Sequence, residues 1–202
     1  MGNFGELVLI LGDLHMPDRA TSIHESFKRM LVPNKMQHVI CTGNISLEHY
    51  NEFRALAPNF VCCRGDFDDE DMGFPEHSLC TVGNFRIGVI HGHQIVPHGS
   101  HDAKARMRRK LKVDILVTGY SHENEVVLRD GFYHINPGSI SGAPSVHSRE
   151  VTPSFILLAI QENKLVCYVY ELLNGEVEVS KTEFVKSVSS ESSPVLLQSL
   201  LG

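Results

Sequence analysis

Aspartate, asparagine and histidine recur where five short apolar runs of this 202-residue chain break off into glycine and polar residues. The segments are GDLH, CTGN, RGDFDDED, IHGH and GYSH. They supply side chains with ligand chemistry: Asp13, His15, Asn44, Asp66, Asp68, His91, His93 and His122. Carboxylate, amide and imidazole groups together suit divalent manganese, iron or zinc. The five segments therefore predict a metal site, if the fold brings them together.

Each segment taken alone has a plainer interpretation. A histidine just past a buried strand, such as His122, is often a hydrogen-bonded loop residue rather than a ligand. Asp13 alone could simply satisfy the backbone donors of a turn. Five such endings in order along the chain favour the metal site over these single explanations.

The runs that carry these residues look like buried strands, and they must position the site. We predict strands over residues 7–11, 38–41, 60–63, 87–90 and 115–117. Apolar residues at helical spacing predict amphipathic helices over residues 21–31 and 47–57, so the first half reads β-α-β-α-β. In an open α/β sheet, ligands bind outside the carboxyl ends of the strands, so the five endings could converge on one crevice.

The second half of the chain is predicted to be antiparallel. Strand-like runs cover residues 126–128, 132–135, 154–160, 165–170 and 177–184. Asp130-Gly131, Glu162-Asn163 and Asn174-Gly175 supply hairpin turns between these runs. We expect an α/β fold of two stacked sheets with helices outside, forming one domain over residues 1–186. A flexible serine-rich tail with an apolar end, PVLLQSLLG, follows over residues 187–202.

Composition and charge exclude several classes of function. The formal net charge of −6 gives no attraction to nucleic acid phosphates. The longest early apolar run is too short to span a bilayer and lacks the flanks of a signal peptide, so we expect no direct membrane insertion. The cysteines are odd in number and lack C-x-x-C spacing, which favours reduced core thiols and a reducing compartment. They are Cys41, Cys62, Cys63, Cys80 and Cys167.

The series GDLH, GN, GD, HGH and GxxH resembles the metallophosphoesterase family. Longer stretches, including LVLILGDLHMP, LVPNKMQHVICTGN and INPGS, resemble the branch of this family that serves as the small subunit of retromer. The resemblance covers about residues 6 to 186. It implies an α/β/β/α fold, with two stacked mixed sheets flanked by helices around a two-metal site.

The resemblance also implies two ligand sets. Asp13, His15 and His122 would surround one metal. Asn44, Asp66 and His91 would surround the other, with a carboxylate between the two ions and His93 near the second metal or the phosphate. The implied cofactor is a divalent metal, manganese or zinc, at weak or partial occupancy.

Three positions depart from what a two-metal hydrolase needs. Phe67 stands where active members carry a histidine, and losing general-acid assistance costs about 10² to 10⁴ in rate. Tyr120 replaces the first histidine of the G-H-x-H motif, and a neutral phenol is a poor ligand. Asn44 is neutral, so it and Asp66 supply only one carboxylate between two cations.

We therefore assign no catalytic residue and expect a non-catalytic scaffold subunit of retromer that serves endosome-to-Golgi and recycling transport. Such a protein is cytoplasmic and reaches the endosome membrane peripherally, through its complex. The alternative function is a weak metal-dependent phosphodiesterase or phosphatase. A third alternative is a structural relic with neither metal nor partner.

Two docking surfaces follow from the resemblance. The metal face would dock to the large helical subunit, vacuolar protein sorting-associated protein 35, through Ile95, Val96 and Pro97, although Ile95 and Val96 could instead cap the core. A second, apolar patch would recruit retromer regulators. Its residues are Met30, Leu31, Val32, Leu157, Tyr168, Tyr170 and Val177.

The patch and the tail each have two interpretations. Alternating strand residues are usually core, whereas Tyr168 and Tyr170 on one strand face suit a half-wet binding surface. The tail is either a disordered extension or a segment that folds back onto the patch and competes with regulators. In the second case its apolar residues Leu196, Leu197, Leu200 and Leu201 would make the contact.

Overall fold

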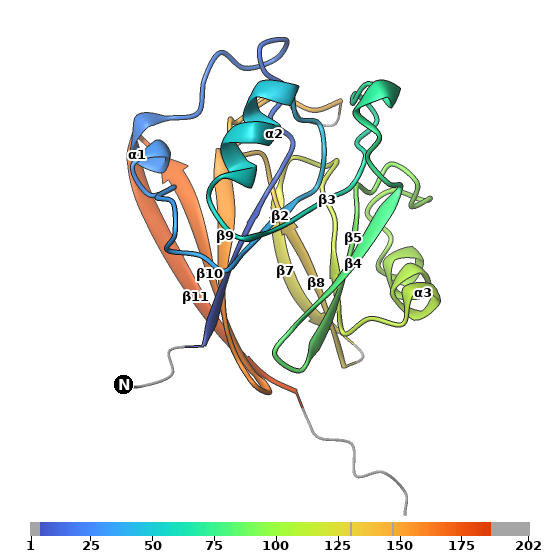
Figure 1. Cartoon of the computed structure of the whole chain (residues 1–202). Coiled ribbons are helices and arrows are strands. Elements are labelled where there is room, and N and C mark those ends of the chain that lie inside the picture. The colour runs from blue at the N-terminus through green and yellow to red at the C-terminus, as the bar shows by residue number, and fades with distance from the viewer. Residues whose placement is uncertain (1–4, 130, 147, 187–202) are drawn as a thin grey trace, which may run out of the picture.

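The structure is a computed structural model that describes residues 5–129, 131–146 and 148–186. Two mixed β-sheets stack against each other, with helices on their outer faces (Figure 1). The first sheet has the order β11-β10-β9-β1-β2-β3 and the second has the order β4-β5-β6-β8-β7. The predicted α/β/β/α architecture is confirmed.

The first sheet joins parallel and antiparallel strands. β1 pairs with β2 and β2 with β3 in parallel, whereas β1 pairs with β9 antiparallel. The bounds are β1 (Glu6–Leu11), β2 (His38–Cys41), β3 (Asn59–Cys62), β9 (Ser154–Gln161), β10 (Lys164–Leu173) and β11 (Glu176–Val185). The predicted antiparallel half therefore does not form a sheet of its own, because β9 returns to β1.

The second sheet is built in the same mixed way. β5, β6 and β8 run parallel, with β4 and β7 antiparallel at the two edges. The bounds are β4 (His77–Val82), β5 (Phe85–Ile90), β6 (Ile115–Val117), β7 (Asn124–Arg129) and β8 (Phe132–Pro137). Sequence reasoning missed β4, because this edge strand alternates exposed and half-buried residues and has no continuous apolar run.

The apolar run of β1 is continuous because the strand is covered on both faces. Val8 and Ile10 belong to the core between the two sheets, while Leu9 and Leu11 pack with Phe27 and Phe53 of the helices. A side chain in a strand alternates between faces, so only a strand buried on both sides reads as VLIL. This burial fixes the position of Asp13 just past the strand.

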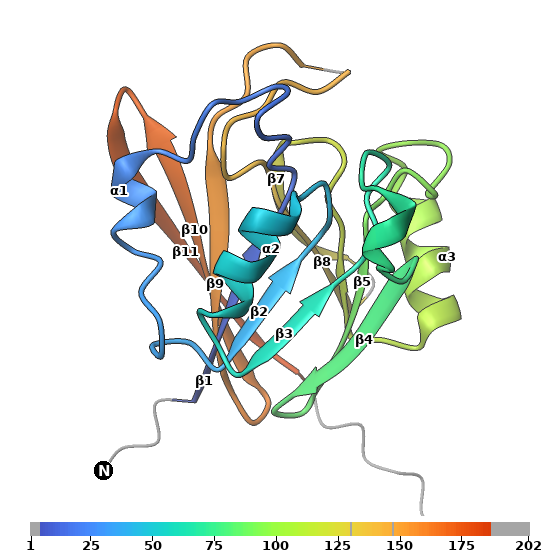
Figure 2. The same cartoon turned by 45° about the horizontal axis from the view of Figure 1, so that its top comes forward.

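The helices lie outside the sheets (Figure 2), and the two that were predicted are shorter than expected. They are α1 (Glu25–Lys28), α2 (Leu47–Arg54), the 3-10 turn η1 (Glu70–Met72) and α3 (His101–Leu111). The prediction of helix over 21–31 is wrong at both ends, because Ile23 and Leu31 pack against the core from irregular backbone. The helix predicted over 47–57 ends at Arg54.

The remaining expectations concern cysteines, membranes and the tail. All five cysteines are free thiols, and burial raises the pKa of Cys80 to about 11 and that of Cys167 to about 12. Within the described part of the chain, no helix is both long enough and apolar enough to cross a membrane. The predicted tail, 187–202, lies outside the described residues.

Candidate metal centre

The site lies where parallel strands of both sheets end, at the edge where the arrows of β2 and β3 finish in Figure 2. Several residues just past these strands have left-handed backbone, which costs L-residues about 1 kcal/mol or more each. The φ angles are 51° at Asp13, 45° at His15, 57° at Asn44, 74° at Tyr120 and 64° at His122. Such clustered strain indicates that these turns are shaped for a site rather than for the fold alone.

The turns bring the predicted ligands into two groups of three. Asp13, His15 and His122 form one group. Asp66, His91 and His93 form the other group. The resemblance had placed His93 near either the second metal or the phosphate. Within each group the ligand atoms all lie within 4.8 Å of one another. Asp13, His15, His91 and His122 are buried, whereas the Asp66 side chain keeps 28% exposure at the mouth.

Asn44 stands between the two groups. Its Oδ1 accepts a hydrogen bond from the Phe67 backbone N–H at 2.9 Å, which fixes the orientation of the amide. Its Nδ2 therefore faces the crevice. The atoms nearest to Nδ2 are Asp66 Oδ1 (3.0 Å), His15 Nε2 (3.0 Å), His91 Nε2 (3.1 Å) and Asp13 Oδ1 (3.4 Å). A neutral amide donor thus lies between the two groups. Asp13 Oδ1 lies 3.7 Å from His91 Nδ1 and 3.9 Å from His122 Nε2, one histidine from each group, so the expectation of a carboxylate between two cations stays a prediction.

Backbone carbonyls orient two of the histidines. His91 Nδ1 donates to the Thr42 carbonyl and His122 Nδ1 donates to the Ala143 carbonyl, both at 2.6 Å. Each bond leaves Nε2 directed away from the backbone, an arrangement typical of metal-ligating histidines. In addition, the buried Nδ1 of His93 has no hydrogen-bond partner among the described residues. The two groups of three therefore fit a divalent metal.

The ionisable groups of the crevice differ in how burial and their neighbours shift their pKa values. Burial, aided by His122 and Arg19, lowers the pKa of His15 to about 3, so this ring is neutral at pH 7. Burial acts against ionised His91, yet Asp13 and Asp66 raise its pKa. Burial likewise opposes ionised Asp66, but hydrogen bonds from His91 and Asn44 hold its pKa well below the usual range. His91 and Asp66 thus pair at 2.9 Å, and a metal must compete with the proton that they share.

Asp68 has a structural role instead of a ligand's role. Its carboxylate accepts three backbone N–H groups, from Asn44 (2.9 Å), Ile45 (2.8 Å) and Gly65 (2.7 Å). These bonds tie the turn after β2 to the turn after β3. Asp68 therefore holds Asn44 and Asp66 at their observed positions.

The mouth of the crevice carries an aromatic residue and a cation. Phe67 is 62% exposed, and its ring meets His15 edge-on at 5.3 Å between centroids. The Arg19 guanidinium lies 4.1 Å above the Phe67 ring and donates to the Pro144 carbonyl at 3.3 Å. Sequence reasoning missed Arg19, for which closeness to His15 in the chain was the only available signal.

Tyr120 lies beside the second group, with its ring near His91 and His93. Its backbone N–H donates to Asp13 Oδ2 at 2.9 Å. Its ring meets His91 edge-on at 5.9 Å and lies 4.9 Å from His98. The residue therefore helps to position Asp13 through its backbone.

The loop after His93 has one apolar residue in the core and two on the surface. Ile95 is only 6% exposed and packs with Ile90, Ala103 and Leu116 beneath α3. The expectation that Ile95 contacts a partner is therefore corrected in favour of the core alternative. Val96 is 68% exposed and Pro97 is also exposed, so both remain accessible.

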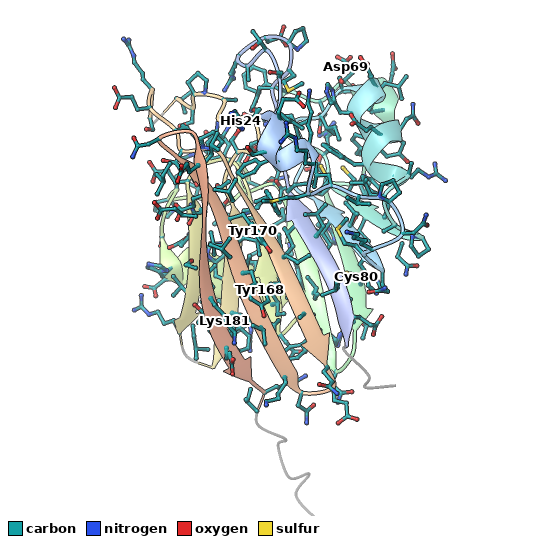
Figure 3. The ribbon with its side chains drawn as sticks, turned by 90° about the vertical axis from the view of Figure 1, so that its left-hand side faces the viewer. His24, Asp69, Cys80, Tyr168, Tyr170 and Lys181 are labelled. Carbon is teal, nitrogen blue, oxygen red and sulfur yellow. The ribbon has the colours of Figure 1, made fainter. Side chains whose placement is uncertain are left out.

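The predicted apolar patch lies on the outer face of the first sheet and beside α1 (Figure 3). Tyr168 pairs with Leu157 of β9, and Tyr170 stacks on Phe155 at 4.6 Å. All seven predicted patch residues keep solvent exposure, with Met30 41% exposed and the others half-buried: Met30, Leu31, Val32, Leu157, Tyr168, Tyr170 and Val177.

Comparison with known proteins is consistent with this geometry. Residues 7–163 match the family described as the calcineurin-like phosphoesterase superfamily domain. Vacuolar protein sorting-associated protein 29 of Schizosaccharomyces pombe is 37% identical over 89% of this chain and 98% of its own length. The structure of Vacuolar Protein Sorting 29 from Cryptosporidium parvum superposes with TM-score 0.86 and 37% identity, over 91% of this chain and 100% of that one. Wild-type Vps29 from Entamoeba histolytica, complexed with zinc, gives TM-score 0.83 and 40% identity, over 88% and 98%.

Proposed function

The chain belongs to the family of vacuolar protein sorting-associated protein 29 (Vps29), within the calcineurin-like phosphoesterase superfamily, and we propose that it acts in vacuolar protein sorting as a non-catalytic scaffold subunit of retromer. The family resemblance seen in the sequence is confirmed by these relatives. The scaffold role is supported by the neutral Asn44 amide between the ligand groups, and the docking role by the exposed apolar residues around the crevice.

The observation that carries the proposal is the Asn44 amide between the two ligand groups. Two-metal hydrolysis holds both cations with an anion between them. The attraction between two opposite unit charges about 4 Å apart is about 4 kcal/mol at an effective dielectric near 20. A neutral amide provides little of this attraction. The Phe67 N–H keeps the amide oxygen away from the crevice, so the amide presents protons where two metals need a ligand.

A single cation remains compatible with this site. Asp13, His15 and His122 would hold it in the first group, or Asp66, His91 and His93 in the second. When bound, a divalent cation polarises a water or a phosphoryl oxygen. Phe67 has no proton to pass to a leaving oxygen, so the chain's own residues supply no general acid at that position. We therefore assign no catalytic residue, with a weak phosphodiesterase as the alternative.

Docking to the large helical subunit, Vps35, would use the rim of the crevice. Phe67 and Val96 are large apolar side chains that remain 62% and 68% exposed. Large apolar side chains that stay exposed mark protein interaction sites. Asp68 ties the turns after β2 and β3 together beside Phe67, so this part of the rim is ordered before binding. The regulators would bind the apolar patch, and the complex would carry the protein to the endosome membrane.

The test is the affinity of the full chain for purified Vps35. Val96→Asp should weaken binding by about tenfold or more, because a charge would be buried at the interface. Leu128→Asp, at a 53% exposed position of β7, is the matched control and should bind normally. Equal affinity of the two variants, or no binding of the wild type, would overturn the docking proposal. Turnover of an aryl phosphodiester with Mn²⁺ that is lost in Asp13→Ala would favour the enzyme instead.

A further inference from the structure

The outer face of the first sheet is apolar and only partly covered. β9, β10 and β11 direct one row of side chains to the same side, because antiparallel partners share a face: Tyr168 lies opposite Leu157 and Lys181, and Tyr170 lies opposite Val179. Figure 3 shows Tyr168, Tyr170 and Lys181 on this face, with α1 above it. We define the outer face by Leu157, Ala159, Val166, Tyr168, Tyr170, Val177 and Val179.

The outer face differs from the core face of the same strands. The alternate residues Cys167 and Val169 are buried between the sheets, whereas Tyr168 is half-buried and Val179 is 50% exposed. A cavity of about 170 Å³ lies at the lower end of the outer face. It is lined by Ala159, Lys164, Val166, Glu183 and Val185, among others. A contiguous half-wet apolar surface of this kind marks a binding site.

The chain itself carries a segment of matching chemistry. Residues 194–201, PVLLQSLL, are mostly branched and apolar. Residues 187–193, SVSSESS, which connect them to β11, are mostly small and polar, with Glu191 as their one charge. Serine-rich segments of this kind serve as linkers. The sequence thus places an apolar segment at the end of a short polar connection.

Residues 187–202 follow β11 at a point from which the outer face is within reach. Lys186 is anchored at the lower end of the sheet, where its backbone N–H donates to Asn163 O and its Nζ to Asp114, both at 2.8 Å. Tyr168 lies opposite Lys181 of β11, which is five residues before Lys186. Five residues of strand span roughly 17 Å. Seven linker residues span up to about 24 Å. The cavity beside Val185 lies at the start of this path.

We propose that residues 194–201 bind in cis to the outer face, with the leucines against Leu157, Tyr168 and Tyr170. The linker then passes the cavity beside Val185. The segment covers the predicted regulator patch in this state, so regulators must displace it. That consequence rests on the proposed function, whereas the binding in cis does not.

A weak contact is sufficient for this arrangement. A short flexible linker gives an effective concentration on the order of 1 mM, so a contact with a dissociation constant near 100 µM in trans would be about 90% formed in cis. A competing ligand would then bind about tenfold more weakly to the wild-type chain than to a chain whose segment cannot bind.

The test uses the full chain and a fluorescein-labelled peptide of residues 187–202, followed by anisotropy. The first variant carries Leu196→Ser, Leu197→Ser, Leu200→Ser and Leu201→Ser, which frees the outer face. We expect the peptide to bind this variant about tenfold more tightly than the wild type. Adding Tyr168→Ser to the variant should abolish binding. Adding Leu128→Ser, in the other sheet, should leave binding unchanged.

Each other outcome overturns the proposal. Equal peptide affinity for wild type and variant would mean that the segment does not occupy the face in cis. No binding to either chain, while thermal unfolding shows both folded, would mean that the face does not take this segment. A wild-type dimer by light scattering that becomes a monomer in the variant would place the segment on a second copy instead.

Discussion

At position 44, an amide rather than a carboxylate decides what the crevice can hold. The Nδ2 of Asn44 carries two protons but lies within 3.4 Å of four potential acceptors. If protonated His91 donates to Asp66, it cannot also accept from Asn44. The Nδ2 group of Asn44 therefore satisfies only part of the acceptors in the crevice. The remaining acceptors are available to one cation, but the fold does not depend on it.

Replacing Asn44 by Asp should reverse this preference. In EDTA the new carboxylate would lie beside Asp13 and Asp66, and like charges at about 4 Å repel by about 4 kcal/mol at an effective dielectric near 20, so the melting temperature should fall. With Zn²⁺ the variant should bind metal about tenfold or more tightly than the wild type by calorimetry. Asn44→Ser, which adds no charge, is the control. Unchanged zinc affinity in Asn44→Asp would contradict the role given to the amide.

Asp68 should matter for stability through its backbone hydrogen bonds and not as a metal ligand. Asp68→Asn puts an amide donor against backbone N–H groups, and leaving such donors unsatisfied costs about 1 to 3 kcal/mol. Urea unfolding should show this loss. Asp69→Asn is the matched control, because Asp69 is exposed and its side chain makes no capping bond, and it should change stability by less than about 0.5 kcal/mol. Equal stability of the two variants would contradict the account.

At the scale of elements, α3 is joined to β7 and β8 by a charged network. Glu125 accepts from Lys104 of α3 and from His134 of β8, the latter at 3.0 Å. His134 Nε2 also meets Thr118 Oγ1 at 2.8 Å. The His134 hydrogen bond, opposed by burial and reinforced by Lys104, lowers the pKa of Glu125 to about 2 from an ordinary 4.5. This network holds the helix that follows the Val96 loop.

Glu125→Gln should therefore destabilise the protein in a pH-dependent way. Because the folded pKa is the lower one, the carboxylate stabilises the fold above pH 4.5 and loses this effect as pH falls towards 2. With 32% exposure screening the group, we expect a loss of about 1 to 2 kcal/mol at pH 7. Urea unfolding should show this gap shrinking by pH 3. Glu123→Gln, at an exposed position, is the control; a gap that widens on acidification would refute this prediction.

The elements could be predicted where burial shapes the local pattern. The strands ending before Asp13, Asn44 and His122 are buried on both faces and read as apolar runs. β4 is an edge strand with Leu79 on its open side, and its pattern carries no such signal. Ile95 looked like a surface residue because its loop is polar, although α3 covers it.

The site could be predicted as a set of residues but not as a geometry. The strand endings indicated which side chains meet. The Asn44 orientation depends on a bond to Phe67, 23 residues away, and the Asp68 role depends on three backbone donors from two loops. Both are tertiary contacts that no local pattern encodes.

At the scale of the whole molecule, the two surfaces lie on different parts of one rigid frame. The crevice and Val96 lie at the ends of the parallel strands, while the outer face lies along β9 to β11 (Figure 3). Under the proposed function, the chain would hold the large subunit at the first surface and regulators at the second. The metal, in this account, is an optional occupant of the first surface.

The most direct test of this account is the affinity of the full chain for Vps35 in EDTA and in Zn²⁺, by calorimetry with metal content measured on the same samples. We predict dissociation constants that agree within about twofold, a difference of less than about 0.5 kcal/mol, because the Phe67 side of the docking rim is held by Asp68 and Asn44 rather than by a cation. A loss of about tenfold or more on chelation, restored by Zn²⁺, would contradict the claim that this crevice docks without metal.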